Sequence, residues 1–234
     1  MRIAAVSDVH YPRFFNRFEK ALESFHGDVD LFIMAGDMVC RGRVEDYGVV
    51  LDVLKGVFGK CRLIGIFGNE EYEERVDRLR DLYPEVVWLD DEELVIGNTC
   101  FVGTRGSLQE PTPWQFRNVA GIRERYRRRE LAIAKMLEAA MRRGLRTVLV
   151  SHYAPTYITL DGEKPSIWKY LGSKRMERLI TKVGVDVVIH GHAHGSRRTE
   201  GVINSTRVYN VALPATGKIT LIDLEVKRGL LEYI

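Results

Sequence analysis

The chain has 234 residues, of which 45% are hydrophobic and 29% charged, enough apolar material to close a large core beneath a well-solvated surface. Its 35 Lys and Arg against 32 Asp and Glu leave a net charge of +3, which excludes a dedicated nucleic-acid coat protein and identifies no partner by itself. The 3 cysteines lie far apart with no C-x-x-C pair, so the sequence favours neither a disulfide framework nor a thiolate zinc site.

Neither a signal peptide nor a membrane span is predicted. Asp8 interrupts the first apolar stretch, and no apolar run approaches the roughly 18 residues that a spanning helix needs. The sequence also lacks internal repeats, low-complexity tracts and Pro/Gly/Ser-rich linkers. We therefore expect a single domain over residues 1–234, located in the reducing cytoplasm.

Short runs rich in Val, Ile and Leu alternate with amphipathic segments, which is typical of an α/β protein with a largely parallel, buried sheet. The runs predict strands at residues 3–7, 31–35, 63–67, 147–151 and 185–190, with helices at 15–25, 44–58 and 71–82. Residues 88–102 break the alternation as two short strands joined at Gly97-Asn98. Residues 202–233 predict further strands without an intervening helix, so we expect a second, more antiparallel sheet.

Side chains that can ligate a metal ion follow each of the five buried strands. They are Asp8 and His10, then Asp37, then Asn69, then His152, and finally His192 and His194. In open α/β sheets, ligands bind beyond the carboxyl ends of the strands, so these side chains are expected to share one crevice.

Seven oxygen and nitrogen ligands exceed the number that one ion takes from imidazole-containing sites, but they suit two ions that share a bridging carboxylate. Mixed imidazole and carboxylate ligands favour Mn, Fe, Zn or Co over Ca or Mg, which prefer oxygen alone. The sequence therefore predicts two divalent ions of one of those four elements.

The order of these residues resembles the calcineurin-like metallophosphoesterases, whose blocks are D-x-H, G-D, G-N-H-[DE], a solitary H and G-H-x-H. The matching positions are Asp8-x-His10, Gly36-Asp37, Gly68-Asn69-Glu70-Glu71, His152 and Gly191-His192-x-His194. The resemblance implies a four-layer α/β/β/α sandwich of two mixed sheets flanked by helices. It also implies that one ion is held by Asp8, His10 and His194, the other by Asn69, His152 and His192, with Asp37 bridging. His190 has no ligand counterpart, and we expect a buried ring with local hydrogen bonds.

The resemblance implies hydrolysis of phosphomonoesters, phosphodiesters or cyclic nucleotides, with Asp37 and Asn69 in the catalytic centre. Two cations polarise the phosphoryl oxygens and lower the pKa of a bridging water, which yields the attacking hydroxide. A small-molecule substrate is favoured, because no large aromatic-rich basic groove is evident. A nuclease of the same family is one alternative. A protein-binding scaffold that keeps the fold without turnover is another.

Two positions depart from the family pattern. Glu70 stands where many members have the His that protonates the leaving oxygen, and Cys40 stands where the protein serine/threonine phosphatase branch has the supporting Asp. Glu70 is interpreted as a general acid, as a group that holds water or a basic part of the substrate, or as a solvated residue. Arg41 matches that branch's phosphate-binding Arg, and a guanidinium suits phosphoryl oxygens. The alternative is an ordinary surface arginine.

The turn-rich segment after residues 101–103 is the other candidate for substrate recognition. It carries Arg105 and Trp114, which are predicted to contact the phosphate and the base of a substrate. The alternative is a loop that is simply packed on the surface.

Overall fold

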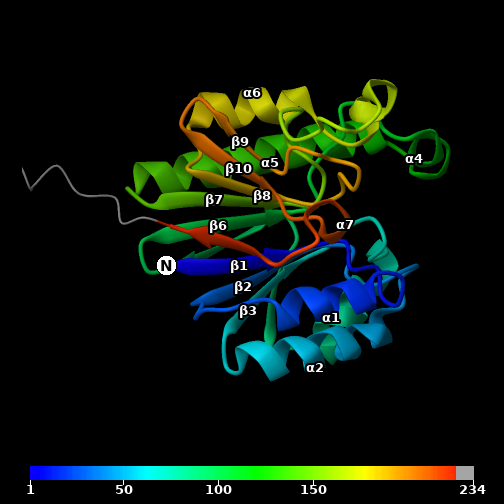
Figure 1. Cartoon of the computed structure of the whole chain (residues 1–234). Coiled ribbons are helices and arrows are strands. Elements are labelled where there is room, and N and C mark those ends of the chain that lie inside the picture. Colours follow the sequence, from blue (N-terminus) through cyan, green and yellow to red (C-terminus); the bar gives the residue numbers. More distant parts are fainter. Residues whose placement is uncertain (225–234) are drawn as a thin grey trace, which may run out of the picture.

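The computed structural model describes residues 1–224 and contains two sheets that lie face to face between two layers of helices (Figure 1). Helices α1 (Phe15–Glu23) and α2 (Tyr47–Phe58) cover the outer face of the first sheet, and α5 (Ile122–Arg142) and α6 (Lys174–Val183) cover the second. The expected four-layer α/β/β/α sandwich is confirmed. The part of the predicted C-terminal strands beyond residue 224 lies outside the described residues.

The first sheet is parallel apart from one edge. It contains β1 (Arg2–Val6), β2 (Leu31–Ala35), β3 (Arg62–Ile66), β4 (Val86–Leu89) and β11 (Thr220–Asp223) in the order β11-β1-β2-β3-β4. Strands β1 to β4 pair in parallel, whereas β11 pairs antiparallel with β1. Every residue of β2 is buried, as expected for a central parallel strand that is covered on both faces.

The second sheet is mixed. It contains β5 (Glu92–Ile96), β6 (Thr99–Thr104), β7 (Arg146–Ser151), β8 (Val187–His190), β9 (Glu200–Ile203) and β10 (Thr206–Asn210) in the order β5-β6-β7-β8-β10-β9. Its two edge pairs, β5–β6 and β9–β10, are antiparallel, but the pairs between them are parallel. The expectation of a more antiparallel sheet therefore holds only at the edges, because helical crossovers precede and follow β7.

The five strands that carry the motifs are divided between the sheets rather than gathered in one. Strands β1, β2 and β3 belong to the first sheet, and β7 and β8 belong to the second. Trp88 was expected to lie in the same pair of strands as Val102, but it belongs to β4 of the first sheet. The backbone turns between the sheets at Asp91, which has a positive φ of 60°.

The remaining helices are short. They are α3 (Val76–Leu82), α4 (Pro113–Asn118) and α7 (Leu213–Thr216), with 3₁₀ turns at Val44–Asp46, Glu73–Arg75 and Pro165–Tyr170. Helix α7 interrupts the C-terminal region that was expected to be free of helix. The predicted helix at 71–82 starts later than expected, so Glu71 lies in the loop before it. The predicted helix at 44–58 is a 3₁₀ turn followed by α2.

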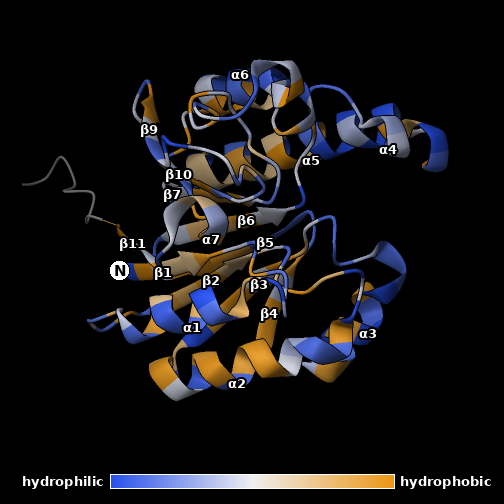
Figure 2. Cartoon of the chain, turned by 45° about the vertical axis from the view of Figure 1, so that its right-hand side comes forward, coloured by the Kyte–Doolittle hydropathy of each residue, from blue (hydrophilic) through white to orange (hydrophobic). Residues whose placement is uncertain are grey.

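Apolar side chains form the core between the sheets and beneath each helical layer. Figure 2 shows the hydrophobic colouring of the strands. On α5, Tyr126, Ile133 and Leu137 form a buried stripe. Met141 is 42% exposed, because it lies in the last turn of the helix. Among residues 1–224, no helix is long and apolar enough to cross a membrane.

Candidate metal centre

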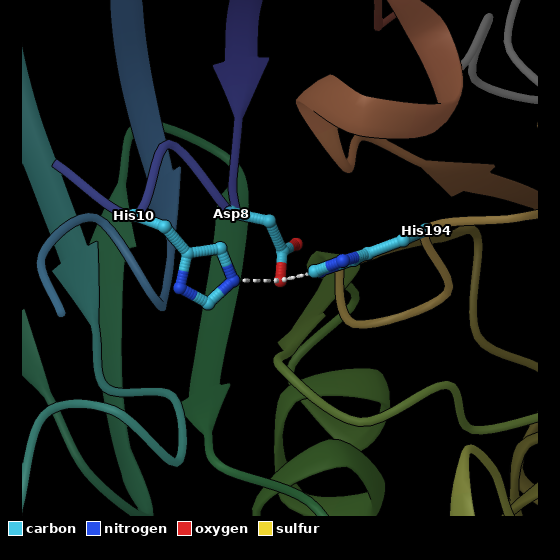
Figure 3. A group of neighbouring side chains, drawn as sticks. All are labelled: Asp8, His10 and His194. Atoms are coloured by element: carbon cyan, nitrogen blue, oxygen red, sulfur yellow. Dashed lines mark hydrogen bonds and ion pairs between the residues drawn. The ribbon is translucent and has the colours of Figure 1, made fainter. Parts of the chain in front are cut away.

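The first cluster of candidate ligands combines Asp8 and His10, which follow β1, with His194 from the segment between β8 and β9. Their ligand atoms lie within 4.8 Å of one another. Both imidazole rings point at the same carboxylate oxygen (Figure 3): Asp8 Oδ1 is 2.9 Å from His194 Nε2 and 3.7 Å from His10 Nε2. Residues 186 positions apart in the chain therefore meet at one point.

The second cluster consists of Asp37 after β2, His152 after β7 and His192 after β8. Their ligand atoms also lie within 4.8 Å of one another. The Oδ1 atom of Asn69 lies 3.2 Å from His152 Nε2, which brings the loop after β3 to the same cluster.

The carboxylate of Asp37 lies between the two clusters. Its Oδ2 atom is 3.4 Å from His152 Nε2 in the second cluster and 3.7 Å from His10 Nε2 in the first. The structure thus brings together all seven predicted metal ligands, with Asp37 in the central position.

The hydrogen bonding of the imidazoles fits cation binding. His10 Nε2 is buried and has no hydrogen-bond partner within residues 1–224. His152 Nδ1 lies 3.1 Å from the carbonyl oxygen of Ala35 and donates to it, so Nε2 faces the oxygens of Asp37 and Asn69. Two acceptor oxygens around a ring nitrogen require either a proton or a metal ion between them. An outer hydrogen bond that orients the ring is also the usual support of a metal-ligating histidine.

The electrostatics favour positive charge at the centre. Although burial disfavours ionisation, the nearby imidazoles of His10, His194 and His152 hold the pKa of Asp8 well below its usual value. Against the same burial, His152 lowers the pKa of Asp37. Burial opposes the protonation of His152, but the Asp37 carboxylate raises its pKa to about 9. Burial lowers the pKa of His192 to about 4.

The backbone is strained where the ligands lie. Seven non-glycine residues among those described adopt a positive φ, and four of them are Asp8, His10, Asp37 and His192, at 47–69°. Each such residue costs about 1–3 kcal/mol and persists only where the surrounding structure enforces it. The strain therefore marks the candidate centre independently of the chemistry of the side chains.

The geometry agrees with a comparison of sequences: a model of the calcineurin-like phosphoesterase family matches residues 1–196. The chain belongs to the calcineurin-like phosphoesterase family. Members of this family are metal-dependent hydrolases of phosphate esters. A search of curated proteins found no match.

Three solved structures show the same fold as this calcineurin-like phosphoesterase. The phosphopantetheinyl hydrolase PptH from Mycobacterium tuberculosis is 20% identical, with a TM-score of 0.62 over 90% of this chain and 88% of that one. The protein TT1561 of Thermus thermophilus is 14% identical, with a TM-score of 0.61 over 95% and 93%. A dimetal phosphatase from Danio rerio is 12% identical, with a TM-score of 0.55 over 90% and 86%. At these identities the likeness concerns the fold alone.

Glu71, the last residue of the family's third block, was predicted only as the start of a helix. It is 1% exposed, and its carboxylate accepts the backbone N–H groups of Asp37, Met38, Val39 and Gly68 at 2.7–3.3 Å. Burial and, to a lesser extent, the charge of Asp37 raise the pKa of Glu71, although the backbone hydrogen bonds act in the opposite direction. Glu71 thus joins the loops that carry two predicted ligands. The only sequence signal for this role was the position of Glu71 at the end of the family's third block.

The carboxylate of Asp8 has its own supports. Its Oδ2 atom accepts a hydrogen bond from Ser7 Oγ at 2.5 Å and another from the backbone N–H of His192 at 2.9 Å. His190 has the local hydrogen bonds that the sequence predicted: its ring is 2.7 Å from Thr159 Oγ1 and 2.8 Å from the carbonyl oxygen of Gly191.

The residues that depart from the family pattern lie in the loop after β2 and in its neighbour. Glu70 is half-buried, and its carboxylate accepts the backbone N–H of Arg41 at 2.7 Å, while its own N–H donates to Asp37 Oδ1 at 2.7 Å. The side chain of Arg41 is exposed. Cys40 Sγ lies 3.1 Å from the carbonyl oxygen of His10 and donates to it. Glu70 and Cys40 therefore both connect segments next to the ligands.

The two predicted substrate contacts have different surroundings. Arg105 is only 7% exposed, and its Nη1 donates to the carbonyl oxygens of Gly68 and Glu71, beneath the Asn69 loop. Trp114 is 62% exposed and lines a pocket of about 300 Å³ that also includes Asn69. The structure thus brings Trp114 to the mouth of the centre but places Arg105 inside the protein.

Proposed function

We propose that the protein is a dinuclear, metal-dependent phosphoesterase that hydrolyses a small-molecule phosphate ester. The position of the Asp37 carboxylate, 3.4 Å from an imidazole of one cluster and 3.7 Å from an imidazole of the other, carries this proposal. A shared carboxylate between two sets of ligands is the arrangement expected for a pair of ions.

The seven ligand residues form two sets, one for each ion. Asp8, His10 and His194 would hold one, Asn69, His152 and His192 the other, and Asp37 both. When bound, two divalent ions polarise phosphoryl oxygens and lower the pKa of water to near neutrality. The mixture of carboxylate and imidazole ligands favours Mn, Fe, Zn or Co.

The protein's own contribution is positioning. Ala35 orients His152, and Ser7 and the His192 backbone orient Asp8, so the ligands do not need to reorganise during a catalytic cycle. The exposed guanidinium of Arg41 follows Asp37 by four residues, and we assign to it the binding of phosphoryl oxygens.

The charges on α5 support a small substrate rather than a nucleic acid. Arg125 pairs with Glu73 at 2.5 Å, Arg128 with Glu124 at 3.3 Å and Arg129 with Asp91 at 2.8 Å. Because these guanidinium groups are already paired with carboxylates, they do not form a free basic track for a polyanion.

The presence of all seven ligand side chains supports an enzyme rather than a scaffold. Buried carboxylates and imidazoles that have no partner are costly, and His10 Nε2 is such an atom among the described residues. A protein that used only its surface would have no reason to retain it.

A screen of phosphomonoesters, phosphodiesters and cyclic nucleotides, with Mn, Zn, Co and Mg added separately, tests the proposal. We expect turnover with at least one metal and a loss of about 100-fold or more in Asp37→Ala and His152→Ala, because each removes a ligand. His26→Ala is the matched control, since His26 lies outside both clusters. Unchanged turnover in either ligand variant would count against the assignment.

A further inference from the structure

We infer that the pocket beside the metal centre binds the organic part of the ester, and that this part is a flat, uncharged group such as an aryl ring or a nucleobase. The inference rests on the proposed function and specifies its substrate class. The pocket, about 300 Å³ in volume, includes Asn69 and His192, both assigned to the second ion. A phosphate bound at the metals therefore has its organic substituent at the mouth of this pocket.

The side chains that line the pocket favour a planar apolar group. Tyr72, Trp114 and Tyr153 supply three aromatic rings from three separate segments of the chain. Aromatic faces stack on flat groups with little dependence on their exact chemistry. Of the three aromatic residues, Trp114 is the most exposed, at 62%, followed by Tyr72 at 39%.

The charge of the lining disfavours a second phosphate. None of the described residues that line the pocket is Lys or Arg, and Glu70 contributes a carboxylate. A further phosphate group in this pocket would lose hydration without meeting a cation. The pocket thus favours a monophosphate ester with an uncharged substituent over a polyphosphate.

Hydrogen bonds fix the inner wall in place. Gln115 Nε2 donates to the Tyr153 hydroxyl at 3.1 Å, and Gln115 Oε1 accepts from the Tyr126 hydroxyl and from the Thr112 backbone N–H, both at 3.0 Å. The Tyr153 ring meets the His192 ring edge to face at a centroid distance of 4.8 Å. Because these partners hold the wall in advance, less ordering is needed when a ligand binds.

Steady-state kinetics with phenyl phosphate and glycerol 3-phosphate test this inference. In Trp114→Ala we expect the KM for phenyl phosphate to rise about tenfold relative to the KM for glycerol 3-phosphate, with little change in kcat, because ground-state stacking is lost. Trp114→Phe should restore most of the preference. Equal effects on the two esters, or no effect on either, would overturn the inference.

Phe116→Ala is the matched control. Phe116 lies on α4, two residues from Trp114, and is 61% exposed, but it does not line the pocket. It should leave the KM ratio unchanged. A change in the ratio as large as that in Trp114→Ala would show that general damage to α4, rather than the pocket, causes the effect.

Calorimetry separates this inference from the proposed function. Absence of turnover with every metal and ester would reject the proposed function. The pocket is then judged by the binding of phenyl phosphate and inorganic phosphate to metal-loaded protein. Tighter binding of phenyl phosphate that Trp114→Ala abolishes supports the pocket. Equal affinity for the two ligands in the unmodified protein rejects it.

Discussion

The carboxylate of Glu71 accepts the backbone N–H of Asp37 and the backbone N–H of Gly68 through the same oxygen, each at 2.7 Å. Its other oxygen accepts the N–H of Met38 at 2.8 Å. One buried side chain therefore sets the spacing between the loop that carries Asp37 and the loop that carries Asn69. We expect it to act as a positioning residue for both clusters of ligands.

Glu71→Gln should weaken metal binding without removing a ligand. The amide can present only one oxygen, and its NH₂ group would face N–H donors, so we expect a loss of about 2–3 kcal/mol in the free energy of unfolding. The metal affinity should fall about 10–100-fold. Denaturant unfolding and metal calorimetry measure the two effects. Glu74→Gln makes the same change at an exposed position nearby and should alter neither.

Arg105→Lys distinguishes a positioning role from a substrate contact. The Nη1 atom of Arg105 donates to two carbonyl oxygens of the Asn69 loop, and the guanidinium lies 5.3 Å from the centroid of the Phe67 ring. A compact ammonium group lacks the planar face that lies against this ring. If Arg105 holds the loop, metal affinity falls about tenfold while the KM of the metal-saturated enzyme is nearly unchanged.

The opposite result for Arg105→Lys, a large rise in KM at unchanged metal affinity, would instead support the substrate contact that the sequence predicted. Arg117→Lys on the exposed surface of α4 serves as the control for the same exchange. It should change neither quantity.

The buried parallel strands could be predicted from sequence because their apolar runs are continuous. Residues 31–35 match β2 at both ends. The boundary between the two sheets could not be predicted, because Asp90 and Asp91 make the turn there without glycine or proline. Trp88 was consequently joined to the next strands. The local periodicity of the sequence also does not show which of the two sheets a parallel strand belongs to.

The candidate ligands could be predicted for a different reason. They lie at the ends of strands, so their place in the chain already indicates where they meet. Glu71 and Arg105 act instead through backbone groups of other segments, 37 residues away in the bond from Arg105 to Gly68. Such contacts have no periodic signature. From the sequence alone, the buried carboxylate is therefore interpreted as the start of a helix and the buried guanidinium as a substrate contact.

Gly36→Ala should disrupt the metal centre and destabilise the protein, whereas Gly56→Ala should stabilise it. A Cβ atom at Gly36 would lie 2.6 Å from Gly68 N and 2.8 Å from His152 Nδ1, and φ is +86°. We therefore expect metal binding to be lost. The free energy of unfolding should fall by several kcal/mol, because overpacking and backbone strain each cost about 1–3 kcal/mol. Calorimetry and thermal unfolding measure this.

Gly56→Ala is the comparison for that substitution. Gly56 lies within α2, and a methyl group added there would meet no heavy atom within 4 Å. Alanine should stabilise the helix by up to about 1 kcal/mol. A stabilised Gly36→Ala protein with intact metal binding would contradict the close approach of the two loops.

Metal ions should raise the melting temperature of chelator-treated protein. Binding to the folded state at a hundredfold excess over Kd stabilises by about 2.7 kcal/mol, which corresponds to roughly 5–10 °C for a chain of this size. Differential scanning calorimetry measures the shift. Asp37→Asn should reduce it strongly, whereas Asp52→Asn on the exposed face of α2 should not. An equal shift in both variants would place the bound ions elsewhere.

Glu70→Gln tests whether Glu70 donates the proton to the leaving group. Its carboxylate accepts the Arg41 backbone N–H at 2.7 Å, a contact that holds a loop, whereas a proton donor must present an O–H to the leaving oxygen. The amide oxygen of Gln can keep the contact, so we expect kcat to fall by less than about tenfold, as for one hydrogen bond weakened.

The pH–rate profile of Glu70→Gln decides between these roles. If Glu70 only holds the loop, the acidic and basic limbs of kcat/KM stay where they are in the unmodified enzyme, since no titrating group of the reaction has been removed. If it is the general acid, the basic limb disappears, because that limb reports loss of the donor's proton. Glu73→Gln, which removes an exposed carboxylate paired with Arg125, controls for the change in net charge. A profile that loses its basic limb in Glu70→Gln alone would restore Glu70 as the proton donor in place of the family's histidine.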